Sequence, residues 1–169
     1  RTGDDISAAF PDRAAALGGH AVLDGELLVG HEFDPLAFNC LQQRLNRKTP
    51  AKSHLKDYPA FVRVYDMLFD GDEDLRDLHL SVRRVRLEAW MAHHAGARLD
   101  LSGVLDFASW EDLAALRSEG AAVHGHEGLM IKRRDSLYVA GRPKGPWFKW
   151  KRDPRLLATV MVYAQRGPR

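Results

Sequence analysis

The stretch from residue 127 to residue 151, EGLMIKRRDSLYVAGRPKGPWFKWK, constrains the fold of this chain most strongly. It closes with lysines that alternate with aromatic residues, and alternate residues of a β-strand share one face. Lys149 and Lys151 are therefore predicted to point one way. Phe148 and Trp150 are predicted to be buried on the other side. Two ammonium groups on one face suit a chain of phosphates, although an ordinary half-buried strand with a solvated basic face has the same pattern.

Size and composition set the outer limits. The chain has 169 residues, 45% of them hydrophobic and 28% charged, which is enough for one ordinary domain with a real core. A net charge of +2 is too small on its own to indicate a nucleic-acid partner. The single cysteine, Cys40, excludes an internal disulfide, is interpreted as a small core residue, and fits a reducing, cytoplasmic setting. No apolar run approaches the ~18 residues of a membrane span, and no signal-peptide pattern is present.

Two segments have a strong strand pattern. In residues 20–29, HAVLDGELLV, apolar residues lie on one face while Asp24 and Glu26 share the other. Acids that simply face solvent would give the same pattern. Residues 61–69, FVRVYDMLF, form the second strand. Further strands are expected at 104–107, 127–139, 146–151 and 156–164, and a polar linker at 49–60.

Helices are predicted from their capping residues. Asp34 followed by Pro35 starts a helix to about Arg47, with an apolar stripe of Ala37, Phe38, Leu41 and Leu45. Ser81 caps a helix to about His94, in which Val82, Val85 and Ala89 form an apolar row that Leu87, Trp90 and Met91 widen. Ser109 caps a helix that ends near Gly120. The mixed order of helices and short strands predicts an α+β fold with largely antiparallel sheets. Neither GxGxxG nor GxxxxGK[ST] is present, so no dinucleotide fold or P-loop is supported.

Four separated motifs then stand in order: DGELL at 24–28, VYDMLF at 64–69, EGLMIK at 127–132 and WFKWK at 147–151. Each alone is weak, but the ordered set resembles the covalent nucleotidyltransferases, and most closely the small bacterial ATP-dependent DNA ligases. The resemblance covers essentially the whole chain, including LQQRLNRK at 41–48 and YVAGRPKGPWFKWKRDP at 138–154. It implies an adenylation domain over residues 1–164 that is incomplete at its N-terminus. It also implies that residues 165–169 begin a linker to an OB-fold domain.

The resemblance implies a role for each matching residue. Glu26 would accept hydrogen bonds from the ribose hydroxyls, and Tyr65 would stack on adenine. Glu127 would hold Mg²⁺, a hard cation suited to carboxylate oxygen. The amines that would surround the phosphates are Lys132, Lys149 and Lys151. Arg1 would touch the ribose or the phosphate at a DNA nick.

The spacing of Glu127 and Lys132 raises a geometric difficulty. These residues are five apart, so a regular strand would put them on opposite faces. Gly128 could admit a bulge that resets the alternation, or Glu127 could lie just before the strand. The residues predicted to contact DNA are Arg1, Arg44, Arg47, Lys48, Arg142 and Lys144. If the chain is instead a non-catalytic scaffold, its basic surface, with salt-dependent affinity, would comprise Arg44, Arg47, Lys48, Arg133, Arg134, Arg142 and Lys144.

One departure from the family pattern is serious. The family's nucleophile is a lysine in a KxDG motif, which this chain lacks and which we expect upstream of Arg1. The expected function is therefore the adenylation domain of a longer, monomeric, nucleoid-associated enzyme. That enzyme would use ATP and Mg²⁺ to seal nicked double-stranded DNA in repair and replication. Two alternatives stay open: an RNA ligase or capping-type nucleotidyltransferase, and a non-catalytic fragment that binds nucleotide or DNA.

Overall fold

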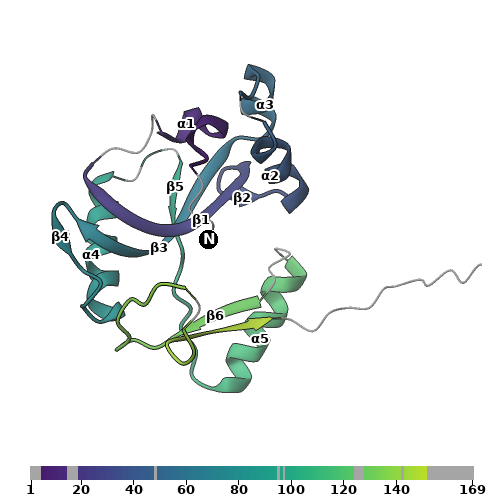
Figure 1. Cartoon of the computed structure of the whole chain (residues 1–169). Coiled ribbons are helices and arrows are strands. Elements are labelled where there is room, and N and C mark those ends of the chain that lie inside the picture. Colours follow the sequence, from purple (N-terminus) through teal and green to yellow (C-terminus); the bar gives the residue numbers. More distant parts are fainter. Residues whose placement is uncertain are drawn as a thin grey trace, which may run out of the picture. The chain divides into compact units, whose positions relative to one another are not determined.

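The computed structural model describes residues 5–14, 19–47, 49–94, 96, 98–123, 128–141 and 143–151. The chain divides into two compact units (Figure 1). The first, called unit 1 below, comprises residues 1–106 and 132–148; the second, unit 2, comprises residues 107–131 and 149–169. Strands β6 (Gly128–Lys132) and β7 (Trp147–Lys151) form a two-stranded sheet, and the chain passes from one unit to the other within each of them.

Unit 1 is built on a curved sheet whose long strands are β1 (Ala21–His31) and β3 (Ala60–Asp70), which pair antiparallel (Figure 1). The short strands β2 (Asp34–Pro35) and β4 (Glu73–Asp74) extend it in the order β2-β1-β3-β4. Strand β5 (Leu99–Leu101) pairs parallel with β3. The predicted strands at 20–29 and 61–69 are confirmed, as is the α+β class with largely antiparallel pairing.

The pairing of β1 with β3 contains two register shifts. At the second, Asp24 lies opposite Asp66 and Gly25 lies opposite Val64, so Tyr65 is the extra residue on β3. A Cβ atom on Gly25 would lie 2.9 Å from the backbone oxygen of Arg63, so the close approach of the strands requires glycine there. Such bulges redirect side chains, and this one sets the direction of Tyr65.

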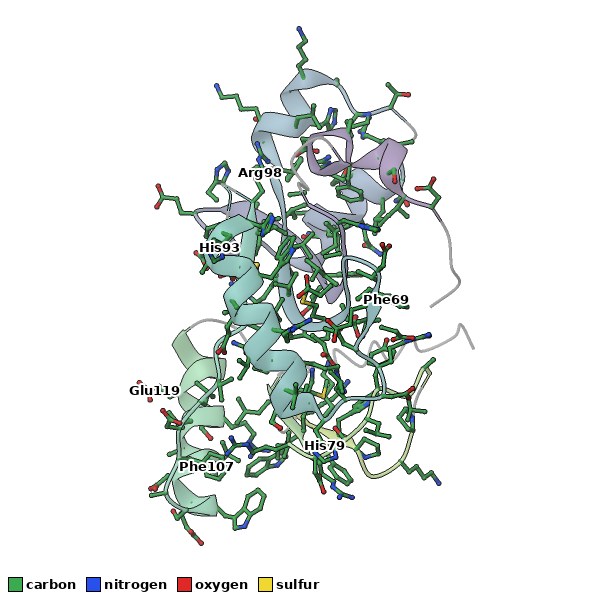
Figure 2. The ribbon with its side chains drawn as sticks, turned by 90° about the vertical axis from the view of Figure 1, so that its left-hand side faces the viewer. Phe69, His79, His93, Arg98, Phe107 and Glu119 are labelled. Carbon is green, nitrogen blue, oxygen red and sulfur yellow. The ribbon has the colours of Figure 1, made fainter. Side chains whose placement is uncertain are left out.

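The main core of unit 1 lies between the sheet and helix α4 (Leu80–His94), whose ends are marked by His79 and His93 in Figure 2. Its buried members are Val64, Met67, Leu75, Leu87, Trp90, Met91 and Leu99. The predicted apolar face of α4 is right for Leu87, Trp90 and Met91, which are buried. It is wrong for Val82 and Val85, which are 46% and 64% exposed, and it misses Arg83, which is buried. The face that packs on the sheet is selected by Asp66 of β3, which binds Arg83.

A second cluster holds the N-terminal segment, with Ala9, Phe10, Val29 and Ala60 buried and Cys40 partly buried against them. Around it lie the 3₁₀ turn η1 (Ser7–Ala9) and the helices α1 (Pro11–Ala14), α2 (Phe38–Leu45) and α3 (Lys52–Asp57). The helix predicted from Asp34 starts at Phe38 instead, because Asp34 and Pro35 pair with the end of β1. Helix α3 occupies half of the expected linker at 49–60.

Unit 2 contains helix α5 (Trp110–Val123) and parts of β6 and β7. Its predicted cap is confirmed, since the backbone N–H of Asp112 donates to the Ser109 hydroxyl at 3.1 Å. The strand expected at 104–107 is wrong; the nearby strand is β5, and Val104 is 70% exposed. The strand expected at 156–164 and the linker at 165–169 lie outside the described residues. Among the helices that the structure describes, none has the length and apolarity needed to cross a membrane.

Candidate functional site

Two tyrosines share one carboxylate in unit 1. The hydroxyl of Tyr65 on β3 donates to Oδ1 of Asp24 on β1 at 3.1 Å. The hydroxyl of Tyr138, from the segment that follows β6, donates to Oδ2 of the same carboxylate at 3.3 Å. Burial raises the pKa of both phenols, and the charge of Asp24 raises each pKa further. Both hydroxyls therefore stay protonated and act as donors at neutral pH.

Lys132, the last residue of β6, lies over the ring of Tyr65. Its Nζ atom is 4.1 Å from the ring centroid, a cation–π contact. Burial lowers the pKa of Lys132, while the carboxylates of Asp66 and Asp24 oppose that shift. The structure thus brings together two residues that the sequence assigned to one site, Tyr65 and Lys132, and one face of the tyrosine ring is covered by the ammonium group.

A buried ion pair lies directly behind this cluster. The Nε and Nη2 atoms of Arg83 donate to the two oxygens of Asp66, both at 2.8 Å, and both side chains are almost fully buried. Arg83 also donates to the backbone oxygens of Leu78 and Ser136 at 2.5 and 3.2 Å. A two-pronged, charge-assisted pair of this kind fixes orientation strongly. It joins β3 and α4 to the segment that carries Tyr138.

That segment also caps α4. The backbone N–H groups of Leu80 and Ser81 donate to the backbone oxygens of Ser136 and Arg134, each at 2.9 Å. These carbonyls satisfy N–H groups that a helix start otherwise leaves without partners. The predicted role of Ser81 as the cap is therefore corrected: the helix begins at Leu80, and backbone carbonyls cap it.

Glu26 is exposed on β1, opposite Arg63 of β3. Its charge contributes to the raised pKa of Tyr65, after burial and Asp24. The guanidinium of Arg63 binds other acceptors: its Nε atom donates to Asp100 at 2.5 Å and its Nη2 atom to the backbone oxygen of Phe33. Glu26 thus presents an acceptor to solvent from the same pair of strands as Tyr65.

The lysines of β7 lie in unit 2. Lys149 and Lys151 are exposed. The ring of Trp150 is half-buried, with the guanidinium carbon of Arg117 4.4 Å from its centroid, and Arg117 also donates to the backbone oxygen of Lys151 at 2.8 Å. The prediction that both aromatic rings are buried is wrong for Phe148, which is 58% exposed. The cover on Trp150 includes an arginine, so this face of the strand is only partly apolar.

Gly128 explains how β6 approaches β7. Its φ is +143°, and a Cβ atom there would lie 2.2 Å from the backbone oxygen of Trp150. Only glycine permits both features. Strand β6 begins at this residue, and Glu127 lies outside the described residues, so its proposed role stays a prediction. In the part of the chain that the structure describes, no group of three His, Cys, Asp or Glu residues is placed to hold a metal ion.

The predicted DNA-contacting surface needs one correction, at Arg44. This side chain is fully buried, with its Nη2 atom 2.6 Å from Asp12 and 2.8 Å from the backbone oxygen of Ala9, and its guanidinium lies over the Phe10 ring. It holds the N-terminal segment against α2 and is not available to a phosphate. Arg47, Arg133, Arg134 and Lys144 are exposed, and Arg133 pairs with Asp135 at 2.7 Å. Arg1, Lys48 and Arg142 lie outside the described residues.

Sequence reasoning missed the site roles of Asp24, Tyr138 and Arg83. Asp24 was placed only on the polar face of its strand, although it adjoins the Gly25 that marks the bulge. Tyr138 begins the segment at 138–154 that resembles the ligases, but the sequence gives no reason to assign this residue a role in the site. Arg83 has no sequence signal, because an arginine near a helix start is usually a surface residue.

Two solved structures of DNA ligase D are similar to this chain in fold. The ligase domain of LigD from M. tuberculosis has a TM-score of 0.67 and 29% identity to this chain, covering 89% of it and 45% of that domain. A mycobacterial DNA ligase D complexed with ATP and MES gives a TM-score of 0.66, also at 29% identity, covering 88% of this chain and 45% of that one. The fold is therefore the mixed α+β fold of a nucleotidyltransferase ligase domain.

The family model described as ATP dependent DNA ligase domain matches residues 1–151. The chain belongs to that family. A DNA ligase of Natronomonas pharaonis is 33% identical over 148 residues, which are 87% of this chain and 26% of that protein. A probable DNA ligase of Koribacter versatilis is 30% identical over an alignment 191 residues long. That alignment covers 99% of this chain and 33% of that protein. The chain thus spans about a quarter to a third of the length of these relatives.

Proposed function

We propose that this chain is the adenylation domain of an ATP-dependent DNA ligase that seals nicks in double-stranded DNA. The observation that carries the proposal is the Tyr65 cluster, in which a bulge displays an aromatic ring between a shared carboxylate and a lysine. It occurs in a chain of the ATP-dependent DNA ligase domain family, and a related structure is titled as a complex with ATP. The proposed setting is the cytoplasm, at the nucleoid, with the whole enzyme acting as a monomer.

Different residues are proposed to bind the base, the ribose and the phosphates of ATP. Tyr65 offers a flat ring for the adenine base, and Glu26 offers an exposed carboxylate to the ribose hydroxyls. The cations Lys132, Lys149 and Lys151 balance the phosphate charge and the charge that develops as pyrophosphate leaves. Arg1 belongs to the ribose or nick-phosphate contacts, and Arg47, Lys48, Arg142 and Lys144 to the DNA backbone contacts.

Two parts of the proposal concern groups that the described residues do not contain. Mg²⁺ supplies charge neutralisation at the phosphates, and Glu127 is its proposed ligand because carboxylate oxygen suits a hard cation. The nucleophile is proposed to be a KxDG lysine upstream of Arg1. In the whole protein its amine takes AMP from ATP, passes it to the 5′-phosphate of the nick, and the 3′-hydroxyl then displaces AMP to close the strand.

The decisive experiment measures the intact mass of the protein, extended upstream to include the KxDG lysine, with and without ATP and Mg²⁺. A gain of one AMP, followed by its loss when nicked DNA is added, is the expected result. The matched control replaces the KxDG lysine by arginine, which keeps the charge but cannot be adenylated. An extended protein that binds no ATP and gains no AMP would refute the proposal.

Assays with different substrates distinguish the proposed DNA ligase function from the alternative functions. Nicked DNA, nicked RNA and GTP are offered in parallel to the same extended protein. Sealing of nicked DNA with ATP supports the proposed function. Sealing restricted to RNA, or an adduct formed only from GTP, would move the chain to the RNA ligase or capping class. Binding of ATP and DNA without any adduct would indicate a non-catalytic module.

A further inference from the structure

Tyr138 reaches the same carboxylate as Tyr65 from a distant part of the sequence. Tyr65 donates to Oδ1 of Asp24 and Tyr138 donates to Oδ2, at 3.1 and 3.3 Å. A carboxylate has two oxygens, so the two hydroxyls do not compete for one acceptor. Each hydroxyl bond therefore helps to fix the carboxylate plane for the other.

We propose that Tyr138 is a positioning residue for the base-stacking ring of Tyr65, and that it acts through Asp24. The inference rests on the proposed function, because that function assigns a nucleotide base to the Tyr65 ring. A phenol oxygen lies in the plane of its ring, so an acceptor fixed in space limits how the ring can tilt. Asp24 can supply a fixed acceptor only if its own carboxylate is prevented from rotating.

Tyr138 is well suited to hold that carboxylate, because it is itself held at three points. Its backbone N–H donates to the backbone oxygen of Arg76 at 2.9 Å. Its ring lies 5.9 Å from the guanidinium carbon of Arg83, which the buried pair with Asp66 immobilises. Its hydroxyl takes the third contact, to Asp24. Binding groups are most effective when a surrounding set of contacts locks them in place before the ligand arrives.

Lys132 adds the second constraint on the ring. Its ammonium group covers one face of Tyr65 at 4.1 Å from the centroid. While that contact lasts, a base can stack only on the opposite face. The ring is therefore held at its hydroxyl by Asp24, and Lys132 restricts which face a base can use.

The expected effect is one of affinity and of modest size. The Tyr138 hydroxyl bond, at 3.3 Å, is longer than the 2.7–2.8 Å typical of O–H···O bonds, so it is weaker than an ideal one. Loss of such a bond to a charged acceptor is expected to weaken ATP binding by about three- to tenfold. In the adenylation reaction of the extended protein, KM for ATP should rise by a similar factor while kcat stays the same.

The test measures ATP binding calorimetrically for the unaltered protein, Tyr138→Phe, Asp24→Ala and the double variant. Asp24→Ala releases both phenols and should weaken binding at least as much as Tyr138→Phe. The double variant should then match Asp24→Ala alone, because Tyr138 has no route to Tyr65 once the carboxylate is gone. Tyr58→Phe is the matched control, since it removes a phenol hydroxyl from the second hydrophobic cluster, and it should bind ATP normally.

Inorganic triphosphate separates positioning of the base from general loosening of the fold. It has no base, so Tyr138→Phe should leave its affinity unchanged. Equal weakening for ATP and triphosphate, unchanged ATP affinity in Tyr138→Phe, or additive effects in the double variant would each overturn the inference alone. Failure of the unaltered protein to bind ATP would overturn the proposed function, and this inference with it.

Discussion

The Tyr65 cluster and the lysine strand β7 are both assigned to one nucleotide, yet they are held in different ways. Tyr65 belongs to a long strand of unit 1 and is backed by a fully enclosed, two-pronged ion pair between Asp66 and Arg83. Strand β7 has five residues, and the contacts recorded to its Trp150 ring and Lys151 backbone come from Arg117. The proposed base site is thus backed by a buried ion pair, whereas the contacts described for the Trp150 ring and the Lys151 backbone come from one arginine.

The comparison shows that the base and the phosphates of a nucleotide place different demands on the residues that bind them. A base is recognised by the shape and direction of a ring, which tolerates little movement. Phosphates are recognised by charge, and flexible ammonium groups accept several geometries. Lysines that balance phosphate charge therefore need less exact placement than a ring that stacks on a base.

The largest expected effect comes from breaking the support of the Tyr65 cluster. Arg83→Met removes one partner of a buried ion pair and leaves Asp66 buried without its counter-charge, so the free energy of unfolding should fall by about 3–5 kcal/mol. Urea unfolding followed by circular dichroism measures it. Arg133→Met is the control, because its pair with Asp135 is exposed and its loss should leave the midpoint unchanged. Equal midpoints for the two variants would show that the buried pair is not the main support.

The next effect separates the ring from its hydroxyl. Tyr65→Ala removes the stacking surface and should weaken ATP binding by about 1–3 kcal/mol, the range measured for stacking of a base on an aromatic side chain. Tyr65→Phe keeps the ring but loses its bond to Asp24, so it should weaken binding at least as much as Tyr138→Phe and less than Tyr65→Ala. Calorimetric titration of ATP into each variant gives the difference. If Tyr65→Phe were as weak as Tyr65→Ala, the hydroxyl contact would carry the binding and the stacking assignment would be wrong.

The same contrast explains what the sequence could predict. Strand alternation found the strands around residues 20–29 and 61–69, because alternation depends on neighbours in the sequence. The resemblance to a known family, and no local pattern, placed Tyr65 and Lys132 in one site. Alternation gives no guide to the direction of Tyr65, because the bulge beside Gly25 interrupts the register there. The period-based stripes of α2 and α4 found some residues that pack on the cores, such as Leu41 and Leu87. They missed the buried Arg44 and Arg83, because acids far away in sequence, Asp12 and Asp66, bind these side chains. A pairing of distant charges leaves no local pattern.

A smaller effect is expected from loosening the lysine strand. Arg117→Leu removes both the cover on Trp150 and the donor to the backbone oxygen of Lys151. We expect ATP affinity to fall by about two- to fivefold, equivalent to the loss of one ordinary hydrogen bond. Arg117→Lys should restore part of it, since an amine can still donate to the carbonyl. Competition with a fluorescent ATP analogue gives the affinities, and a loss as large as that of Tyr65→Ala would contradict the lighter role given to this strand.

The smallest expected effect is a delayed ionisation of the two phenols of the Tyr65 cluster, Tyr65 and Tyr138. Burial and Asp24 raise the pKa of Tyr65 and Tyr138 above the usual value near 10, so both phenols should ionise later than an exposed tyrosine in an alkaline absorbance titration. The unfolded chain ionises these groups near pH 10 while the folded protein keeps them protonated. Their contribution to stability is therefore complete below pH 10 and is lost as the pH rises through the raised pKa values.

Substitutions show whether the late ionisation comes from Tyr65 and Tyr138. Asp24→Ala removes the charge and the acceptor common to both phenols, so it should shift the late component of the curve to lower pH. Tyr65→Phe and Tyr138→Phe should each delete one late-ionising group. Arg117→Leu removes the contacts to Trp150 and Lys151 and should leave the curve unchanged. A late component that survived Asp24→Ala at its original pH would mean that burial alone sets the phenol pKa values, and that the shared carboxylate does not hold the two rings.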